Sequence, residues 1–174
     1  MAKKKEYRSY HTNGKLDTQI NYIDDKKEGI YRNYFYNEQI ELEVNFINDK
    51  YEGLYKLFFN NRKLSVELNY RDGKKYGIYK DYYKNGQLQE EINYINDKRE
   101  GIFKFYWSNG QLCKKVNYIN DKKQGICEIF FNNGQLYKEI NYVDNEINAI
   151  YIKYYDNIQL KQQKMFIDNF VVYN

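Results

Sequence analysis

An Asn followed three residues later by Leu or Ile recurs seven times in this chain, at a spacing of 24 residues. The seven pairs are Asn13/Leu16, Asn37/Ile40, Asn61/Leu64, Asn85/Leu88, Asn109/Leu112, Asn133/Leu136 and Asn157/Leu160. A second series has the same phase: Gly29, Gly53, Gly77, Gly101 and Gly125, with Ala149 in the sixth place. A period of this length is typical of repeat architectures, so we expect an array of small units and not a domain built around one compact core.

The repeats use nearly the whole chain. Units that begin at the glycine position span residues 5–28, 29–52, 53–76, 77–100, 101–124, 125–148 and 149–172. No linker or shift in composition interrupts them, and we therefore predict one repeat domain over residues 5–172. The mean hydropathy is −0.96, yet the chain has 22 Tyr and 10 Phe. Such a chain is expected to pack aromatic rings with polar edges.

Each unit reads as a β-hairpin. In the fourth unit, residues 77–83 form a β-prone, aromatic run and residues 87–95 form the returning strand. Asn85-Gly86 between them predicts a two-residue type I′ turn, and residues 96–100 predict a polar turn to the next hairpin. A turn every dozen residues leaves too little room for helices. We therefore predict an all-β chain of seven tandem 24-residue β-hairpins, with about fourteen strands in one single-layer antiparallel meander sheet.

The two-residue turn predicts a register that can be compared with the charges. It places Lys80 opposite Glu91, Tyr83 opposite Leu88 and Gly77 opposite Tyr94. The same pairing predicts the opposite-charge pairs Arg32/Glu43 and Lys56/Glu67, but also the like-charge pairs Lys104/Lys115 and Glu128/Glu139. For the like-charge pairs we expect diagonal relief, because Lys115 lies between Glu91 and Glu139 of neighbouring repeats.

Alternation then assigns the faces of the sheet. One face carries an apolar layer, and the other carries the charged pairs together with aliphatic residues. In the fourth unit the apolar face holds Tyr79, Tyr83, Leu88, Ile92 and Tyr94, and the other face holds Ile78, Tyr82, Asn93 and Ile95. Phe35, Phe59, Trp107, Phe131 and Tyr155 are expected to stack along the apolar face. A Tyr or Phe opposite each strand Gly is expected to cover the gap that the missing side chain leaves, and the Asn21 to Asn141 series is expected to form an amide ladder.

Units of the form Tyr-Tyr-x-Asn-Gly-x-Leu, followed by Asn-Tyr-x-Asn-x-Lys-x-Glu-Gly, resemble the bacterial variant of the MORN repeat over nearly the whole chain. The chain also resembles bacterial proteins of the YwqK antitoxin family. The resemblance implies a twisted, trough-shaped sheet in a solenoid-type array, a binding or scaffolding function, and no catalytic residues. The turn Gly is absent at Glu38-Gln39, Arg62-Lys63 and Ile158, where we expect longer or differently shaped turns.

Enzyme chemistry has little support in the sequence. The single histidine, His11, occupies a position held in other repeats by Phe, Tyr or Trp, which favours a structural role. Cys113 and Cys127 fall on opposite faces in the predicted register, which favours free thiols. The acidic turns lack the ligand spacing of calcium loops, and no nucleotide-binding or hydrolase motif occurs. We therefore expect no catalytic residues, no metal site and no cofactor.

The sequence also carries an expectation about where the protein is located. No apolar run approaches the roughly 20 residues that span a bilayer, which predicts a cytoplasmic protein. A secreted or surface protein is the alternative, if a signal peptide was removed before Met1-Ala2-Lys3.

The apolar residues 170–173 at the end of the chain are expected to fold back over an edge strand more readily than to dock a partner.

Charge limits the classes of partner. The net charge of +4 comes from 28 basic and 24 acidic residues, too balanced for a dedicated nucleic-acid binder. Basic residues next to aromatic ones nevertheless recur in phase, and the candidate partner-binding residues are Arg32, Lys56, Lys80, Lys104, Tyr34, Tyr82, Tyr106 and Trp107. Neutralisation of the basic residues by Glu43, Glu67 and Glu91 is the simpler interpretation.

Three function classes remain. The favoured one is a module that binds a partner protein, with an antitoxin or immunity protein that covers a toxin as its sharpest form. The second is a protein that binds a membrane surface through anionic lipids, and the third binds carbohydrate of the cell wall through rows of aromatic side chains. Self-association through an exposed aromatic row is a further expectation.

Overall fold

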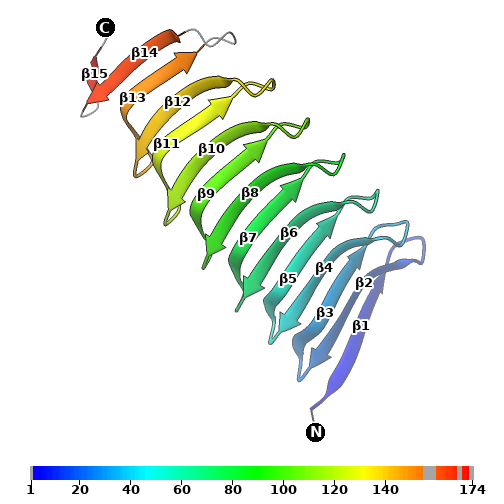
Figure 1. The fold of residues 1–174 in the computed structure, drawn as a ribbon. Helices are drawn as coiled ribbons and strands as arrows, with labels where there is room; N and C mark the ends of the chain where they lie inside the picture. Colours follow the sequence, from blue (N-terminus) through cyan, green and yellow to red (C-terminus); the bar gives the residue numbers. More distant parts are fainter. Residues whose placement is uncertain (1, 155–159, 168–169, 173–174) are drawn as a thin grey trace. The chain divides into compact units, whose positions relative to one another are not determined.

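The computed structural model describes the backbone of residues 2–154, 160–167 and 170–172, and the side chains of residues 2–148. Fifteen strands follow one another without an intervening helix in this part of the chain (Figure 1). They are β1 (Lys4–Tyr10), β2 (Leu16–Ile23), β3 (Lys26–Tyr34), β4 (Ile40–Ile47), β5 (Lys50–Phe58), β6 (Leu64–Arg71), β7 (Lys74–Tyr82), β8 (Leu88–Ile95), β9 (Lys98–Tyr106), β10 (Leu112–Ile119), β11 (Lys122–Phe130), β12 (Leu136–Val143), β13 (Glu146–Tyr154), β14 (Leu160–Ile167) and β15 (Phe170–Val172).

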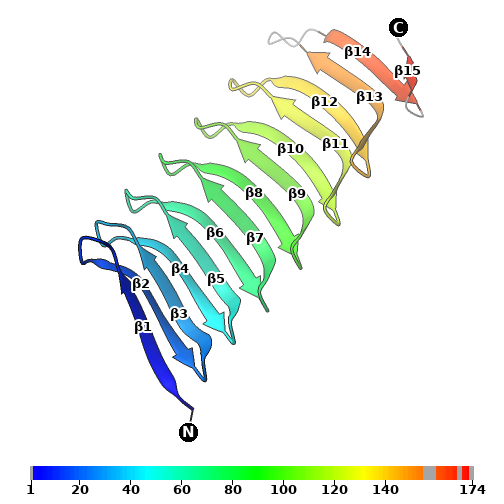
Figure 2. The ribbon, with the colours of Figure 1, turned by 180° about the vertical axis from the view of Figure 1, so that it is seen from behind.

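The chain divides into two compact units, residues 1–86 with β1–β7 and residues 87–174 with β8–β15. Within each unit every strand pairs antiparallel with the next strand along the chain (Figure 2). The predicted all-β meander of 24-residue hairpins is confirmed. Strand β15 is an addition to the predicted fourteen, and it pairs antiparallel with β14. The expected return of the C-terminal residues onto an edge strand is therefore confirmed.

The predicted register is confirmed in the middle of the hairpins. Arg32 lies opposite Glu43, Lys56 opposite Glu67, Lys104 opposite Lys115, and Glu128 opposite Glu139; Gly53 and Gly101 face Tyr70 and Tyr118. The relief expected for the like charges has another origin than we predicted. Lys115 Nζ lies 2.8 Å from Glu128 Oε2 on the adjacent strand β11, and not beside a diagonal carboxylate.

The Asn-Gly turns differ from the predicted two-residue type I′ turns. In the turn after β9, Gly110 N donates to Trp107 O and Trp107 N donates to Gln111 O, each at 2.8 Å, so three residues form the loop. Of the three loop residues 108–110, only Gly110 has a positive φ, of 85°. This longer loop shifts the register by one residue, so Leu112 pairs with Tyr106 and not with Trp107. Because paired residues point to the same side of a sheet, Leu112 shares a face with Tyr106, contrary to our prediction for this column.

Two-residue turns occur instead at the polar connections between hairpins. Ile47 pairs with Lys50, and the two residues between them, Asn48 and Asp49, have φ of 50° and 65°. Two positive φ values in a two-residue loop are the signature of a type I′ turn, and Asn and Asp tolerate this conformation better than most residues. The recurring Asn and Asp pairs are therefore turn formers.

The turns without glycine keep the shape of the others. Glu38 and Arg62 take the glycine's place with φ of 65° and 67°. Their backbone N–H groups donate to Phe35 O at 2.8 Å and Phe59 O at 2.9 Å, the same bond that Gly110 makes. Our expectation of altered turns is wrong at these two places, and Ile158 lies outside the described residues.

The Asn that defines the repeat has two contacts that the sequence did not disclose. Asn109 Oδ1 accepts from Gln111 N at 3.0 Å, which closes its own turn, and Asn109 Nδ2 donates to Asn132 O of the next repeat at 2.8 Å. The other recurrent Asn series does not form the predicted amide ladder. Asn45 lies between Ile30 and Glu52, so successive members stand two strands, or about 10 Å, apart.

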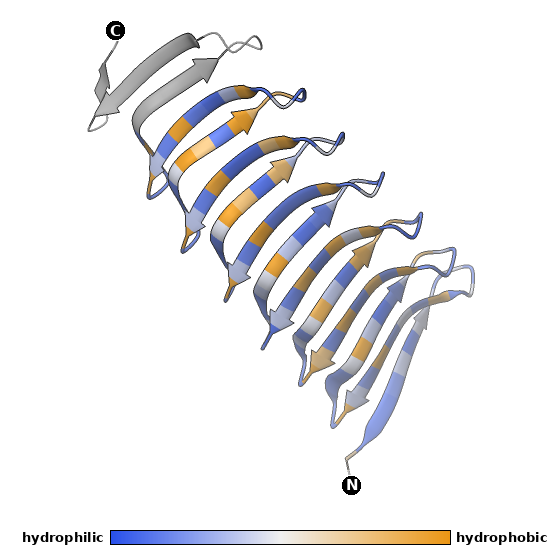
Figure 3. Cartoon of the chain, in the orientation of Figure 1, coloured by the Kyte–Doolittle hydropathy of each residue, from blue (hydrophilic) through white to orange (hydrophobic). Residues whose placement is uncertain are grey.

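The buried side chains lie on the face predicted to be apolar, which we call the core face. They are Ile20, Val44, Phe46 and Leu68 in the first unit and Ile92, Val116, Tyr118, Cys127 and Ile140 in the second. Apolar bands recur along the strands in Figure 3. In the first unit Phe46 packs against Tyr51, with ring centroids 4.8 Å apart. Burial among such rings, with the neighbouring tyrosines adding to it, raises the pKa of Tyr55 to about 12.

Both cysteines are free, Cys127 buried and Cys113 half-buried. The register shift between Leu112 and Lys114 passes through Cys113, so the strict alternation that predicted opposite faces does not apply there. Burial disfavours the thiolate and raises the pKa of both thiols.

We therefore expect DTNB to modify Cys113 slowly in the native chain, and Cys127 only after unfolding in urea. Because the pKa of Cys113 is raised, its rate should keep rising at a pH where an exposed thiol is already ionised. The Cys113→Ala variant is the control and should show no native reaction. Two equally fast native thiols would contradict the described burial of Cys127.

Candidate binding face

The face opposite the core face carries a row of charges, and we call it the charged face. In the first unit the row is Arg8, Gln19, Arg32, Glu43, Lys56, Glu67 and Lys80, one residue from each strand. Arg32 Nε donates to Glu43 Oε2 at 2.7 Å, and this hydrogen bond raises the pKa of Arg32. Glu67 lies between Lys56 and Lys80 on the neighbouring strands.

The second unit has its own row, made of Glu91, Lys104, Lys115, Glu128 and Glu139. Lys104 Nζ lies 3.4 Å from Glu91 Oε1. Carboxylates thus contact two of the four predicted basic residues, Arg32 and Lys104. This arrangement favours the simpler interpretation of the basic series at those two positions, since a cation engaged by a carboxylate attracts an anionic polymer less strongly.

The predicted aromatic residues divide between two places. Tyr34, Tyr82 and Tyr106 lie two residues beyond a basic residue on the same strand, so they belong to the charged face, and they are half-buried. Tyr34 Oη donates to Gln19 Oε1 at 3.4 Å. Trp107 lies in the turn after β9, where its Nε1 donates to Phe130 O at 3.3 Å.

The structure therefore brings five candidates together on the charged face of the first unit: Arg32, Tyr34, Lys56, Lys80 and Tyr82. Lys104 and Tyr106 share the charged face of the second unit, and Trp107 stands apart from them in its turn.

Exposed aliphatic side chains also occupy the charged face, and our candidate set did not include them. They are Ile30, Ile47, Leu54 and Ile78 in the first unit, 42–53% exposed, and Ile95, Ile102, Ile119, Ile126 and Val143 in the second, 41–59% exposed. Isolated exposed aliphatic residues are common on proteins, but these recur in phase on one face. An aliphatic residue two positions before a basic residue was the sequence signal that could have identified four of them, namely Ile30, Leu54, Ile78 and Ile102.

His11 has a structural role, as its position predicted. Its Nε2 lies 2.8 Å from Tyr34 O, and its ring stacks on Tyr36 with centroids 4.1 Å apart. The Nε1 of Trp107 makes the equivalent bond in its own repeat. Ser9 Oγ donates to Asp17 at 3.0 Å and not to His11, so the described contacts form no Ser–His pair for nucleophilic catalysis.

The described part of the chain contains no group of three or more His, Cys, Asp or Glu side chains placed to bind a metal ion. The same part of the chain has no helix that is long and apolar enough to cross a membrane.

One family of known proteins has a sequence profile that matches this chain. The sequence profile described as MORN repeat variant matches residues 3–24, 27–48, 75–96, 99–120 and 123–144, which is more than half of the chain. No curated protein matches. Among solved structures, the chain is similar to a crystal structure of a mutant S. aureus TarM in complex with Fondaparinux, alpha-GlcNAc-glycerol and UDP. That similarity has 17% identity and a TM-score of 0.36, and covers 55% of this chain and 19% of that one.

Proposed function

Because this chain belongs to the MORN repeat variant family, whose repeats are generally binding or scaffold modules, we propose that it is a non-enzymatic module that binds a partner protein on its charged face. The observation that carries the proposal is the set of exposed aliphatic residues on that face. In the first unit Ile30, Leu54 and Ile78 are 48%, 42% and 53% exposed and hold equivalent positions on every second strand.

Burial of these side chains would supply the driving force for binding. Apolar surface contributes about 25 cal/mol per Å² removed from water. Members of the series stand about 10 Å apart, so a partner must present a complementary apolar surface over several strands to cover them. Such an extended contact suits a folded protein surface or a long polypeptide segment.

The charge row beside the aliphatic series would determine how the partner is oriented. In the first unit cations and carboxylates alternate from Arg32 to Lys80. Alternating charge selects a partner with the complementary pattern more than it attracts any one sign of charge. This pattern supports a protein partner over an anionic lipid layer, where a continuous cationic surface would bind better.

In its sharpest form the proposal assigns an antitoxin or immunity role. An extended face can cover the functional surface of a toxin without any chemistry of its own, which agrees with a family that is non-catalytic in general. Addition of the purified chain should then inhibit the activity of the captured partner in proportion to the complex formed.

The test is affinity capture from the native cell extract with the intact chain as bait. We expect one protein to be retained stoichiometrically, and the triple variant Ile30→Ser, Leu54→Ser, Ile78→Ser to lose at least nine-tenths of it. The matched control is Tyr7→Ser with Ile147→Ser, which removes side chains of similar exposure, 47% and 42%, outside the aliphatic series. The control should retain the partner.

A different outcome would contradict the proposal. If the bait retains only lipid or wall polymer, and charge reversal at Arg32, Lys56 and Lys80 abolishes that retention, the basic residues form the site. The protein would then bind an anionic surface, and the contact should weaken at high salt.

A further inference from the structure

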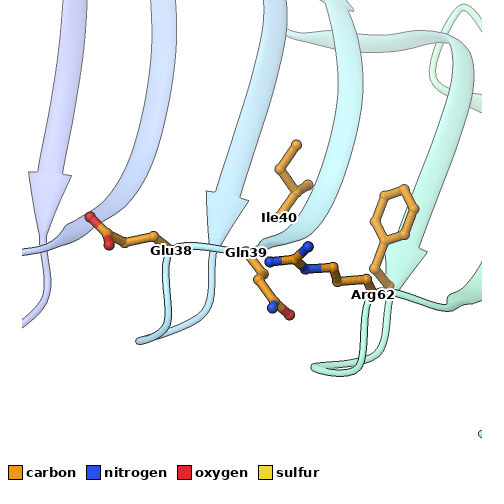
Figure 4. A pocket seen from close by; sticks show the side chains of 5 residues that line it. Glu38, Gln39, Ile40 and Arg62 are labelled. Atoms are coloured by element: carbon orange, nitrogen blue, oxygen red, sulfur yellow. The ribbon is translucent and has the colours of Figure 1, made fainter.

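A pocket of about 330 Å³ lies at the two turns of the first unit that lack glycine. Glu38, Gln39, Ile40, Phe58 and Arg62 line it, from the β3–β4 and β5–β6 hairpins (Figure 4). Among the six hairpin turns of this kind that the structure describes, only these two have a side chain at the left-handed position. The other four have Gly14, Gly86, Gly110 and Gly134.

The two substitutions are unfavourable for the turn itself. A residue with a Cβ is strained at φ of 65° or 67°, where glycine is not. The backbone of each turn gains no hydrogen bond in return, because the backbone bonds of Glu38 and Arg62 match those of the glycine turns. Any benefit that offsets the strain must therefore come from contacts of these side chains beyond their own turns.

Arg62 is held in the pocket by one of its N–H groups. The Gln39 carboxamide, in the orientation that satisfies both neighbours, donates to Asn60 O at 2.7 Å and accepts from Arg62 Nε at 2.8 Å. The Arg62 side chain extends toward Gln39 and Ile40, as Figure 4 shows. The bond to Nε fixes the guanidinium plane and leaves the two terminal NH₂ groups available to a ligand.

Glu38 does not neutralise this arginine. Its side chain points away from Arg62 in Figure 4, and its Oε2 lies 3.3 Å from Lys15 Nζ. No carboxylate pairs with Arg62 among the described residues. The pocket therefore presents one cation whose charge is uncompensated, beside the half-buried apolar side chains of Ile40 and Phe58.

We propose that this pocket binds a carboxylate side chain of a partner polypeptide together with an apolar residue next to it. A planar guanidinium matches a carboxylate through two parallel hydrogen bonds. Ile40 and Phe58 supply an apolar wall for the neighbouring residue. The assignment rests on the proposed function, since it names the anchor by which a protein partner is recognised.

The probe is the blocked tripeptide acetyl-Leu-Glu-Leu-amide, titrated into the full chain with methyl-labelled isoleucine and observed by NMR. We expect millimolar binding that shifts the Ile40 methyl signal and leaves that of Ile102 unchanged. The neutral peptide acetyl-Leu-Gln-Leu-amide should bind at least tenfold more weakly. Hexanoate should bind more weakly than the tripeptide, since it offers the carboxylate with only one apolar arm.

The decisive variant is Arg62→Gly, which introduces the residue found at the equivalent position of four other turns in this chain. It relieves the backbone strain, so the chain should fold at least as well as the parent while binding of the tripeptide falls at least tenfold. Arg71→Gly is the matched control, because it removes an arginine of the same unit that packs on Tyr76 instead. This control should leave tripeptide binding unchanged.

Three outcomes would overturn the assignment: no shift at Ile40, equal binding of the Glu and Gln peptides, or binding of hexanoate but not of the tripeptide. The last would assign the pocket to a free small carboxylate. Failure here is distinguishable from failure of the proposed function. If capture of the partner survives Arg62→Gly but is lost in the triple variant of Ile30, Leu54 and Ile78, the proposed protein-binding face stands. Only the assignment of the Arg62 pocket as its anchor is then wrong.

Discussion

Replacement of Phe46 by alanine is expected to lower the free energy of unfolding by about 3–5 kcal/mol. Phe46 is 6% exposed on the core face. Its ring contacts Tyr51 at 4.8 Å and Tyr31 at 5.9 Å between centroids, and the Lys27 ammonium lies 5.0 Å from it. Removal of the ring exposes the aromatic cluster, and a single sheet has no second layer that could move in to fill the space.

Urea denaturation of the full chain, followed by circular dichroism, measures this difference. Ile30→Ala is the matched control, because Ile30 is 48% exposed on the opposite face of the preceding strand. We expect it to cost less than about 1 kcal/mol. Equal effects at the two positions would mean that the core face contributes no more stability than the charged face.

The contrast between these two residues shows how far the sequence predicts the fold. Alternation within a strand divides Phe46 and Ile30 between faces correctly. The more continuous apolar layer also predicts the buried face, but it does not say how deeply each residue is buried, since both faces carry apolar residues. Burial is decided by what the neighbouring strands place alongside: aromatic rings surround Phe46, whereas Asn45 lies opposite Ile30. In a single-layer sheet this lateral packing takes the place of a second layer.

The hairpin turns could not be read from the dipeptide alone. Asn-Gly suits a two-residue type I′ turn, but it also suits a three-residue loop with glycine in the left-handed position, as at Gly110. The dipeptide also leaves out a long-range contact, since Asn109 Nδ2 donates to the carbonyl of Asn132 in the next repeat. The three-residue loop shifts the pairing next to the turn by one residue, which a short-range turn rule did not predict.

The candidate site was predicted only in part for a similar reason. Periodicity identified the basic residues and Tyr34, Tyr82 and Tyr106, because they recur in phase. It could not show that Arg32 is bonded to Glu43, since the spacing alone leaves the side-chain rotamers open. The pocket at Arg62 comes from two departures from the repeat that we expected to distort the backbone. The backbone instead keeps the shape of the glycine turns, and the side chains of Glu38 and Arg62 help to line the pocket.

Replacement of Gly53 by alanine is expected to lower the free energy of unfolding by about 1–2 kcal/mol. Glu43 pairs with Lys56 and Asn45 with Glu52, so residues 53–55 all lie opposite Val44. The bulge that results places Gly53 at φ of 78°. A Cβ added there would meet nothing within 4 Å, so the expected cost comes from the backbone conformation and not from crowding.

This result separates two explanations of the recurring glycine. The sequence suggested that Tyr70 covers the gap opposite Gly53, and the pairing of the two residues is confirmed. Coverage by Tyr70, however, would make any small side chain acceptable. If the left-handed backbone requires the glycine, Gly53→Asn should cost less than Gly53→Ala, because Asn enters this region more readily. The same urea measurement gives both values, and a larger cost for Asn would show that space at Tyr70 matters more than φ.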